Sequence, residues 1–376
     1  MYGYGLHMRI AHVSDCYAPR TGGIETQVRA LAMAQRDQGN DVCVITATPG
    51  HDAVRAGLDL VDGIEVYRVA ARLPFELPVH PRTRAHVVNV LTAHPVDVVH
   101  VHAGVISPFA WGAIRAARQL GLPTLVTVHS VWGPLATPGF KLANALTRWN
   151  NVAVSSVSAR AAESVEAALG RPVLVTPNGI DVDAWRVAPA SAERNTIRLV
   201  SVMRLAPRKR LTPLLRMITQ AKAELDGEVQ VHATIIGDGP ELAKAYSFIA
   251  RHGLGNTVVM PGRLSPGEIR EVFAHSDVFV QPSIKESFGL AALEARSAGL
   301  PVIVQAESGS TEFVEDRVSG LVANGDLAMV SAIVDLARDV QLRERIAAHN
   351  RDVPPVQSWD GVLAAVEHGY AVAGAT

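Results

Sequence analysis

The chain has 376 residues, a formal net charge of -1 and 48% hydrophobic residues. This length allows two domains with separate cores, and the near-zero charge argues against a nucleic-acid partner. No uncharged apolar run reaches the ~18 residues that a membrane span needs. Residues 1–7 lack the charged and apolar regions of a signal peptide, so we expect a cytoplasmic protein.

Short β-rich runs alternate with longer helical patterns, which predicts βα units and parallel sheets. In the first half, strands are predicted at 9–14, 42–46, 98–102, 124–129 and 152–154, with an additional strand at 63–69. Helices are predicted between them, for example at 26–38 and 107–120. The two cysteines, Cys16 and Cys43, lie in or beside these strands and are expected to be buried free thiols.

A second series of strands is predicted at 197–202, 231–236, 258–260, 278–281 and 302–304. The small, polar, Pro-containing segment 188–195 separates the two series. We therefore predict an N-terminal domain of residues 1–188 and a C-terminal domain of residues 196–376. A helix is predicted at 326–350, and a last helix at about 357–373 after the break at Pro354-Pro355. Parallel sheets bind ligands outside the carboxyl ends of their strands, so a cleft between two such ends is the expected active site.

The most informative segment places two carboxylates, Glu286 and Glu294, eight positions apart across a strand-to-helix junction. A helix that starts near Gly289 offers free backbone N–H groups and the positive end of its dipole, which suit a phosphate. Carboxylates accept hydrogen bonds from hydroxyl groups. The combination favours a site for a nucleotide-sugar.

Further polar groups follow other predicted strands. The turn Gly22-Gly23 lets the backbone approach a ligand and precedes a helix. His129 ends the strand 124–129, so it points toward the ligand-binding edge, and His102 lies one strand earlier. Arg204 and Lys209 follow the strand 197–202, where their charges can neutralise a diphosphate without a metal.

An Asp-x-Asp triplet at residues 181–183 follows a Pro-Asn-Gly turn. That context does not suit metal binding, so we predict no metal site.

The stretch from Glu286 to Val304 resembles the nucleotide-sugar site of the family 4 retaining glycosyltransferases, which have the GT-B fold. The matching residues are Glu286, Phe288, Gly289, Glu294, Ala295, Ala298, Gly299, Pro301 and Val302. The resemblance extends from about Met8 to the last helix. It implies an α/β fold of two Rossmann-like domains that face each other across a cleft, with the last helix crossing back to the N-terminal domain.

The resemblance implies a retaining transferase that moves a hexose from UDP- or GDP-hexose to an acceptor hydroxyl and forms an α-glycosidic bond. The acceptor would be a sugar, a lipid-linked sugar or a small molecule. The nucleotide-sugar is a co-substrate, and neither a cofactor nor a metal is expected.

The resemblance also assigns roles to residues. Arg204 and Lys209 would stabilise the departing diphosphate, Glu286 would hold sugar hydroxyls, and His129 would line the sugar site. Nucleotide-sugar binding is assigned to Gly22, Gly23, Gly262, Arg263, Leu264, Ser287, Phe288, Gly289, Leu290 and Glu294, with Glu294 on the ribose.

The chain also departs from the family pattern. The family pattern after the strand 197–202 is Gly-Arg-Leu, then any three residues, then Lys-Gly. Here Met203 and Arg210 replace the two glycines. Ser308 stands at a position where the family usually has a Gly-Gly pair. These departures leave open a catalytically silent nucleotide-sugar-binding scaffold. A nucleotide-sugar 2-epimerase is a further alternative, because it uses the same fold.

Weak peripheral contact with a membrane also stays open. Four basic residues lie in apolar helical stretches of the first domain, as in helices that dock on lipid. They are Arg115, Arg118, Lys141 and Arg148.

Overall fold

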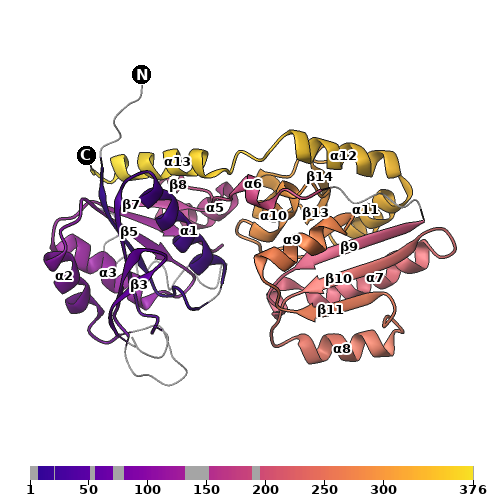
Figure 1. Cartoon of the computed structure of the whole chain (residues 1–376), viewed down its shortest axis with the longest axis horizontal. Coiled ribbons are helices and arrows are strands. Elements are labelled where there is room, and N and C mark those ends of the chain that lie inside the picture. The colour runs from indigo at the N-terminus through magenta and orange to yellow at the C-terminus, as the bar shows by residue number, and fades with distance from the viewer. Residues whose placement is uncertain are drawn as a thin grey trace. The chain divides into compact units, whose positions relative to one another are not determined.

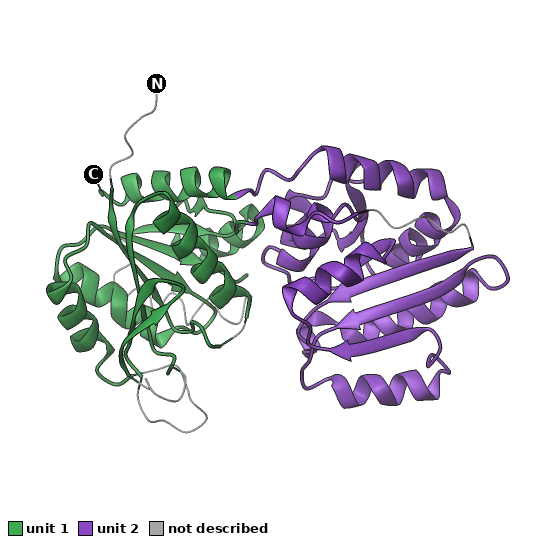
Figure 2. Ribbon diagram, in the orientation of Figure 1, with its two compact units in different colours: residues 1–179, 359–376 green, residues 180–358 purple. Residues whose placement is uncertain are grey.

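The computed structural model describes residues 7–20, 22–50, 56–70, 80–131, 152–188 and 195–375. These residues form an α/β fold with two parallel-sheet units (Figures 1 and 2), which confirms the predicted fold class. Unit 1 contains residues 1–179 and 359–376, and unit 2 contains residues 180–358. The predicted linker, 188–195, lies mostly outside the described residues.

The sheet of unit 1 has the strand order β3-β4-β2-β1-β5-β6-β7-β8. Its strands are β1 (Arg9–Ser14), β2 (Asp41–Thr46), β3 (Gly57–Val61), β4 (Ile64–Arg68), β5 (Val98–Ala103), β6 (Thr124–Val128), β7 (Ala153–Ser156) and β8 (Leu174–Val175). Among the described strands of this sheet, only β3 and β4 pair antiparallel. The turn between them has positive φ at both Asp62 and Gly63, which matches the twist of a two-residue hairpin.

Helices cover both faces of this sheet. One apolar core lies beneath α2 (Thr83–Ala93), α3 (Pro108–Gln119) and α5 (Ala159–Leu169). The other lies beneath α1 (Gly23–Asp37) and α13 (Trp359–Val372). The yellow helix α13 packs against α1, β6 and β7 (Figure 1), so the last helix returns to the N-terminal unit as predicted.

The sheet of unit 2 is parallel throughout, with the strand order β11-β10-β9-β12-β13-β14. Its strands are β9 (Thr196–Val202), β10 (Gln230–Ile236), β11 (Val258–Gly262), β12 (Val278–Gln281), β13 (Val302–Gln305) and β14 (Gly320–Ala323). The helices are α6 (Val182–Trp185), α7 (Leu211–Glu224), α8 (Leu242–Arg251), α9 (Pro266–Ala274), α10 (Leu290–Ser297), α11 (Asp326–Arg338) and α12 (Val340–Asp352), with short 3-10 turns η3 (Pro207–Lys209) and η4 (Gly309–Glu312).

One predicted helix is wrong in its extent. The segment 326–350 was expected to be continuous, but it is divided into α11 and α12 at Asp339. The Asp339 carboxylate accepts a hydrogen bond from the Leu342 N–H at 2.8 Å and caps the start of α12. A capping side chain of this kind favours a new helix start over continuation of the old one.

Each sheet has a point where the strand order reverses. In unit 2 the chain builds β9, β10 and β11 outward and then adds β12 on the other side of β9. In unit 1 the corresponding pair is β1 and β5. Loops diverge at such a point and leave space for a ligand beyond the carboxyl ends of the strands.

Within the described residues, every helix is too short or too polar to cross a membrane.

Candidate functional site

Two residues predicted to act together meet at the reversal point of unit 2. Lys209 follows β9 and Glu286 follows β12, the strand beside it. The Lys209 Nζ donates to Oε2 of Glu286 at 2.5 Å, and the two side chains are only 19% and 12% exposed. Their ion pair therefore ties together the two loops that border the expected ligand site.

Arg204 also follows β9, but its side chain is exposed and forms no ion pair or hydrogen bond with the described residues. A guanidinium in this state can turn to an incoming phosphate without breaking an existing contact. Of the two cations predicted to contact the diphosphate, Lys209 is thus paired and Arg204 is unpaired.

The start of α10 lies in the same loop region as Glu286. Gly289 has φ +94°, and an added Cβ would lie 1.9 Å from the Ser310 Oγ, so only glycine fits there. No acidic residue stands in the first turn, and no side chain caps it. The N–H groups of Leu290 and Ala291 have no acceptor within the helix, which makes this helix start suitable for an anion.

Glu294 lies one turn into α10 and is half-buried. Its carboxylate forms no ion pair or hydrogen bond with the residues that the structure describes. Burial without a partner raises the pKa of Glu294 to about 8, so the group is mostly protonated at neutral pH. A buried carboxyl group without a partner is well suited to receive a ligand hydroxyl.

The glycine departures have a structural explanation at Arg210. This residue has φ +61° and takes the left-handed conformation that glycine adopts easily. Its guanidinium donates to both carboxylate oxygens of Asp326 at 2.8 Å and to the Pro282 carbonyl at 3.1 Å. These side-chain contacts stabilise the left-handed backbone conformation of Arg210. The turn therefore has the backbone conformation typical of glycine although the residue is an arginine.

Three of the predicted binding residues lie further along the sheet. Gly262 ends β11, and Arg263 and Leu264 follow it. Strand β10 separates β11 from β9, so these residues stand apart from the Lys209–Glu286 pair. Arg263 makes a 3.4 Å ion pair with Asp238, and both side chains are exposed, so this pair contributes little to stability.

The reversal point of unit 1 carries the Gly22-Gly23 turn. Gly22 precedes the fifteen-residue helix α1 with an extended backbone, and both glycines are exposed. Nothing lies within 4 Å of the position that a Cβ of Gly23 would occupy. A ligand group can therefore approach the backbone at Gly23, whereas the Glu25 carboxylate lies beside Gly22.

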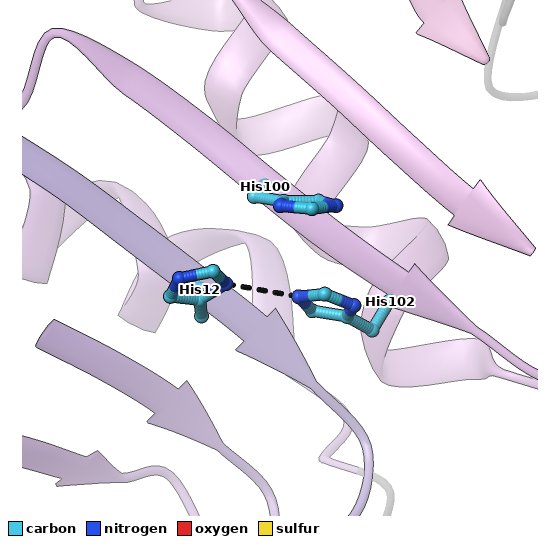
Figure 3. Close-up of side chains that lie close together, drawn as sticks. All are labelled: His12, His100 and His102. Atoms are coloured by element: carbon cyan, nitrogen blue, oxygen red, sulfur yellow. Dashed lines mark hydrogen bonds between the residues drawn. The ribbon is translucent and has the colours of Figure 1, made fainter. Parts of the chain in front are cut away.

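His129 directly follows β6 and is half-buried, and its Nε2 lies 3.0 Å from the Nδ1 of His102. Behind it, His12, His100 and His102 gather in the core with ligand atoms within 4.8 Å of one another (Figure 3). Burial lowers the pKa of His12 and of His129 to about 4, and it lowers the pKa values of His100 and His102 well below the usual value for histidine. All four imidazoles are therefore neutral at pH 7.

Several buried polar residues were missed from the sequence. Asp15 follows β1, and its carboxylate accepts a hydrogen bond from the Phe109 N–H at 3.1 Å at the start of α3. Burial raises its pKa to about 7. Hydrogen bonds join His12, Gln35 and Tyr370 to the other buried histidines. For His12 the available signal was a polar side chain in a strand that is otherwise apolar, whereas Gln35 and Tyr370 lie on the helices α1 and α13.

The Asp-x-Asp triplet belongs to the start of α6. Asp181 caps this helix by accepting from the Ala184 N–H at 3.0 Å, and the exposed Asp183 pairs with Arg186 at 3.1 Å.

Both halves of the chain match glycosyltransferase sequence families. Residues 21–184 match the family described as Glycosyltransferase Family 4, and residues 183–353 match Glycosyl transferases group 1. The 2-deoxystreptamine glucosyltransferase of Streptomyces kanamyceticus is 30% identical over 336 residues, which cover 83% of this chain and 81% of that protein. The phosphatidylinositol N-acetylglucosaminyltransferase gpi3 subunit of Schizosaccharomyces pombe is 27% identical over 371 residues, 95% of this chain and 79% of that protein.

Solved structures agree with this match at the level of the fold. The crystal structure of Anabaena Alr3699/HepE in complex with UDP and glucose superposes with a TM-score of 0.75 at 20% identity. The superposition covers 97% of this chain and 100% of that one.

Proposed function

Because the chain belongs to glycosyltransferase family 4 and has the GT-B fold, we propose that it transfers a hexose from UDP- or GDP-hexose to an acceptor hydroxyl with retention of configuration. The observation that supports this most directly is the group at the reversal point of unit 2. There the Lys209–Glu286 pair, the unpaired Arg204 and the free start of α10 lie on neighbouring loops.

In the proposed reaction, the bond between the anomeric carbon and the diphosphate oxygen breaks as the acceptor oxygen bonds to the same face of that carbon. Arg204, Lys209 and the α10 N–H groups stabilise the charge that develops on the diphosphate. The acceptor proton passes to the departing phosphate oxygen, so the chain does not need to supply a separate general base. Glu286 orients the sugar through its hydroxyl groups.

Glu294 is assigned to the ribose in this proposal. A carboxylate accepts hydrogen bonds from vicinal hydroxyl groups, and Glu294 has no competing partner among the described residues. Binding of the ribose then favours the ionised form of a group that is mostly protonated beforehand.

The names of similar proteins support the classes of donor and acceptor. The Anabaena structure contains UDP and glucose, which supports a uridine nucleotide donor with a hexose. One relative is named for a small-molecule acceptor and another for a lipid. We therefore keep both a small molecule and a lipid-linked acceptor in the proposal.

Weak membrane contact is part of this proposal for a lipid acceptor. Of the four basic residues that suggest it, Arg115 and Arg118 lie on α3, and Lys141 and Arg148 lie outside the described residues. Sedimentation with liposomes, with and without anionic lipid, tests this point. Binding that does not depend on anionic lipid contradicts a basic docking face.

The experiment that tests the function is thermal stabilisation by UDP, GDP, ADP and dTDP, each with and without magnesium. A nucleotide at 100 times its dissociation constant adds about 2.7 kcal/mol to the free energy of unfolding. We expect UDP or GDP to stabilise the protein without magnesium, and the matching nucleotide-hexose to be consumed when an acceptor is added. Stabilisation without turnover supports the scaffold, and a changed sugar without acceptor supports the epimerase. Absence of any shift contradicts nucleotide binding.

A further inference from the structure

Two neighbouring strands of unit 2 end in a buried glutamine. Strand β12 reads Val-Phe-Val-Gln and β13 reads Val-Ile-Val-Gln, so an apolar run ends in the same polar residue twice. Gln281 is 7% exposed and Gln305 is 2% exposed. Both lie at the carboxyl ends of parallel strands, where the ligand-binding loops begin. A buried amide needs hydrogen-bond partners, and the partners of each glutamine identify the segment that it supports.

Gln305 supports the start of α11. Its Oε1 accepts a hydrogen bond from the Gly325 N–H at 3.2 Å, and its Nε2 lies 2.9 Å from the Met329 Sδ. Among the described residues, none of its hydrogen bonds reaches the segment 286–289, which we call the donor loop.

Gln281 lies directly beneath the donor loop. Its Oε1 is 2.6 Å from the Oγ of Ser310, a fully buried residue of η4. The same Oγ is 2.9 Å from the carbonyl oxygen of Phe288. A Cβ added to Gly289 would lie 3.0 Å from both end atoms of the Gln281 amide. Gln281 and Ser310 therefore contact the last part of this loop.

The single hydrogen of the Ser310 hydroxyl determines the direction of these bonds. It can serve one acceptor, and the Phe288 carbonyl oxygen can only accept. With Oε1 of Gln281 facing the hydroxyl, one of the two buried oxygens lacks a hydrogen, which is unfavourable. A half-turn of the Gln281 amide satisfies all three groups, because its NH₂ then donates to Oγ and Oγ donates to Phe288.

A second contact joins η4 to the first part of the donor loop. The Gly309 N–H donates to the Glu286 carbonyl oxygen at 2.9 Å. A Cβ added to Gly309 would lie 2.2 Å from the Ser287 carbonyl oxygen, so the two backbones are in direct contact. Two carbonyl groups of the donor loop, those of Glu286 and Phe288, are thus bonded to η4.

These bonds fix the direction of the peptide groups in the donor loop. In a trans peptide the C=O and the following N–H point in opposite directions, and the peptides of this loop are trans. The N–H groups of Ser287 and Gly289 therefore point away from η4. Carbonyl oxygens repel a phosphate, whereas successive N–H groups attract one. The loop is thus turned so that its N–H groups can add to those at the start of α10.

We propose that Ser310 and Gln281 are positioning residues for the diphosphate of the donor. Ser310 holds the Phe288 carbonyl group away from the phosphate, and Gln281 fixes the hydroxyl group of Ser310. Neither side chain needs to touch the ligand. This role rests on the proposed function, because the ligand is the diphosphate of a nucleotide.

The first test measures binding of UDP and GDP to the full chain by calorimetry. Ser310→Ala frees the Phe288 peptide to turn and should weaken the nucleotide that binds by about five-fold, the value of one neutral hydrogen bond. Affinity for uridine or guanosine should not change, because a nucleoside has no phosphate.

Thr311→Val is the matched control for Ser310→Ala. The Thr311 hydroxyl belongs to the same turn and donates to the Ser308 carbonyl oxygen at 2.9 Å, so this variant loses a similar bond away from the donor loop. Urea unfolding should show a loss of stability in both variants. Nucleotide affinity should fall in Ser310→Ala alone.

The second test compares Gln281→Met with Gln305→Met. Each variant replaces a buried amide by an apolar side chain of similar size at the end of a neighbouring strand. Gln281→Met should weaken the nucleotide less than Ser310→Ala does, since Ser310 can still donate to Phe288, and Gln305→Met should leave its affinity unchanged. This pair decides the question if Ser310→Ala does not fold.

The outcomes separate this role from the proposed function. Equal nucleotide affinities of Ser310→Ala and Thr311→Val would overturn the positioning role alone. So would equal losses in the two glutamine variants, or a loss of nucleoside affinity as large as that of nucleotide affinity. If neither UDP nor GDP binds the unaltered protein, the proposed function and the positioning role are both wrong.

Discussion

Lys209 and Glu286 stand 77 residues apart in the chain, yet the Lys209 Nζ lies 2.5 Å from the Glu286 Oε2 in a mostly buried ion pair. In the ligand-free protein, the lysine proposed to stabilise the diphosphate is therefore already paired with a carboxylate. A bound nucleotide-sugar brings both a competing anion for the lysine and hydroxyl groups for Glu286. The two partners are thus kept desolvated and close to where each one acts.

Removal of the lysine tests this arrangement. Lys209→Ala should lower kcat by about 10²–10³-fold, equivalent to ~2.7–4 kcal/mol of transition-state stabilisation. Arg208→Ala is the matched control, because Arg208 is the exposed neighbour and loses the same charge. Steady-state kinetics with the donor found by thermal stabilisation measures both variants. A Lys209→Ala enzyme with unchanged kcat would remove this residue from the mechanism.

Nucleotide binding should release protons through Glu294. Its pKa of about 8 in the free protein must fall when the carboxylate accepts ribose hydroxyls. Affinity should therefore rise with pH and level off above about pH 8. Calorimetry at pH 7 in buffers of different ionisation enthalpy measures the released protons. Glu294→Gln should weaken binding and abolish the buffer dependence, whereas the exposed Glu271→Gln should change neither. Proton release that persists in Glu294→Gln would assign it to another group.

The backbone at Arg210 gives a prediction about stability. Arg210→Gly should change the free energy of unfolding by less than about 1 kcal/mol, because relief of the left-handed conformation offsets the lost Asp326 contacts. Arg210→Val should cost more, on the order of 2–3 kcal/mol, since a β-branched residue adopts positive φ poorly and makes no ion pair. Urea unfolding compares the two. Equal losses would show that the backbone conformation does not limit stability here.

The buried histidines should make unit 1 sensitive to acid. The pKa of His12 is about 4 in the folded protein and 6.5 unfolded, so the unfolded chain binds more protons between these values. The contribution of neutral His12 to the free energy of unfolding is fully present above about pH 6.5 and is lost as the pH falls toward 4. The loss amounts to about 3 kcal/mol for one such histidine. Asp15 acts in the opposite direction, because its raised pKa of about 7 favours folding as pH falls.

Urea unfolding of the unaltered chain, His12→Asn and His232→Asn between pH 4 and 7 separates these effects. The exposed His232 serves as the control. His12→Asn should reduce the loss of stability on acidification, and His232→Asn should not. If all three proteins lose stability in parallel, His12 is not the group that titrates.

Strands with a buried apolar run were predictable from the sequence, and β1 and β12 have the predicted bounds. Three strands were not predicted from the sequence, each for a different reason. Strand β3 exposes Leu58 and Leu60 and depends on the Asp62-Gly63 turn for its pairing. Strand β8 has only two residues, and β14 begins at a glycine that tightly fits against β13. Periodicity carries little information about such short or exposed segments.

The candidate site was predictable as a set of residues but not as a set of contacts. A carboxylate pair around a helix start can be recognised locally, and α10 begins after Gly289 as predicted. The Lys209–Glu286 ion pair and the path from Gln35 to Tyr370 join distant segments, which only tertiary packing brings together. The backbone of Arg210 was unpredictable for the same reason, because Asp326 holds it from the start of α11.

The return of α13 to unit 1 also has a consequence for the order of synthesis. Val362, Leu363, Val366 and Tyr370 complete the core on one face of that unit, and Trp359 packs so closely on Gly179 that a Cβ there would lie 2.6 Å from the ring. During translation, all of residues 180–358 leave the ribosome before these side chains do. While unit 2 is synthesised, the part of this apolar face that α13 later covers is therefore exposed, although α1 already covers the rest, and a chaperone that shields the exposed part is most needed in that interval.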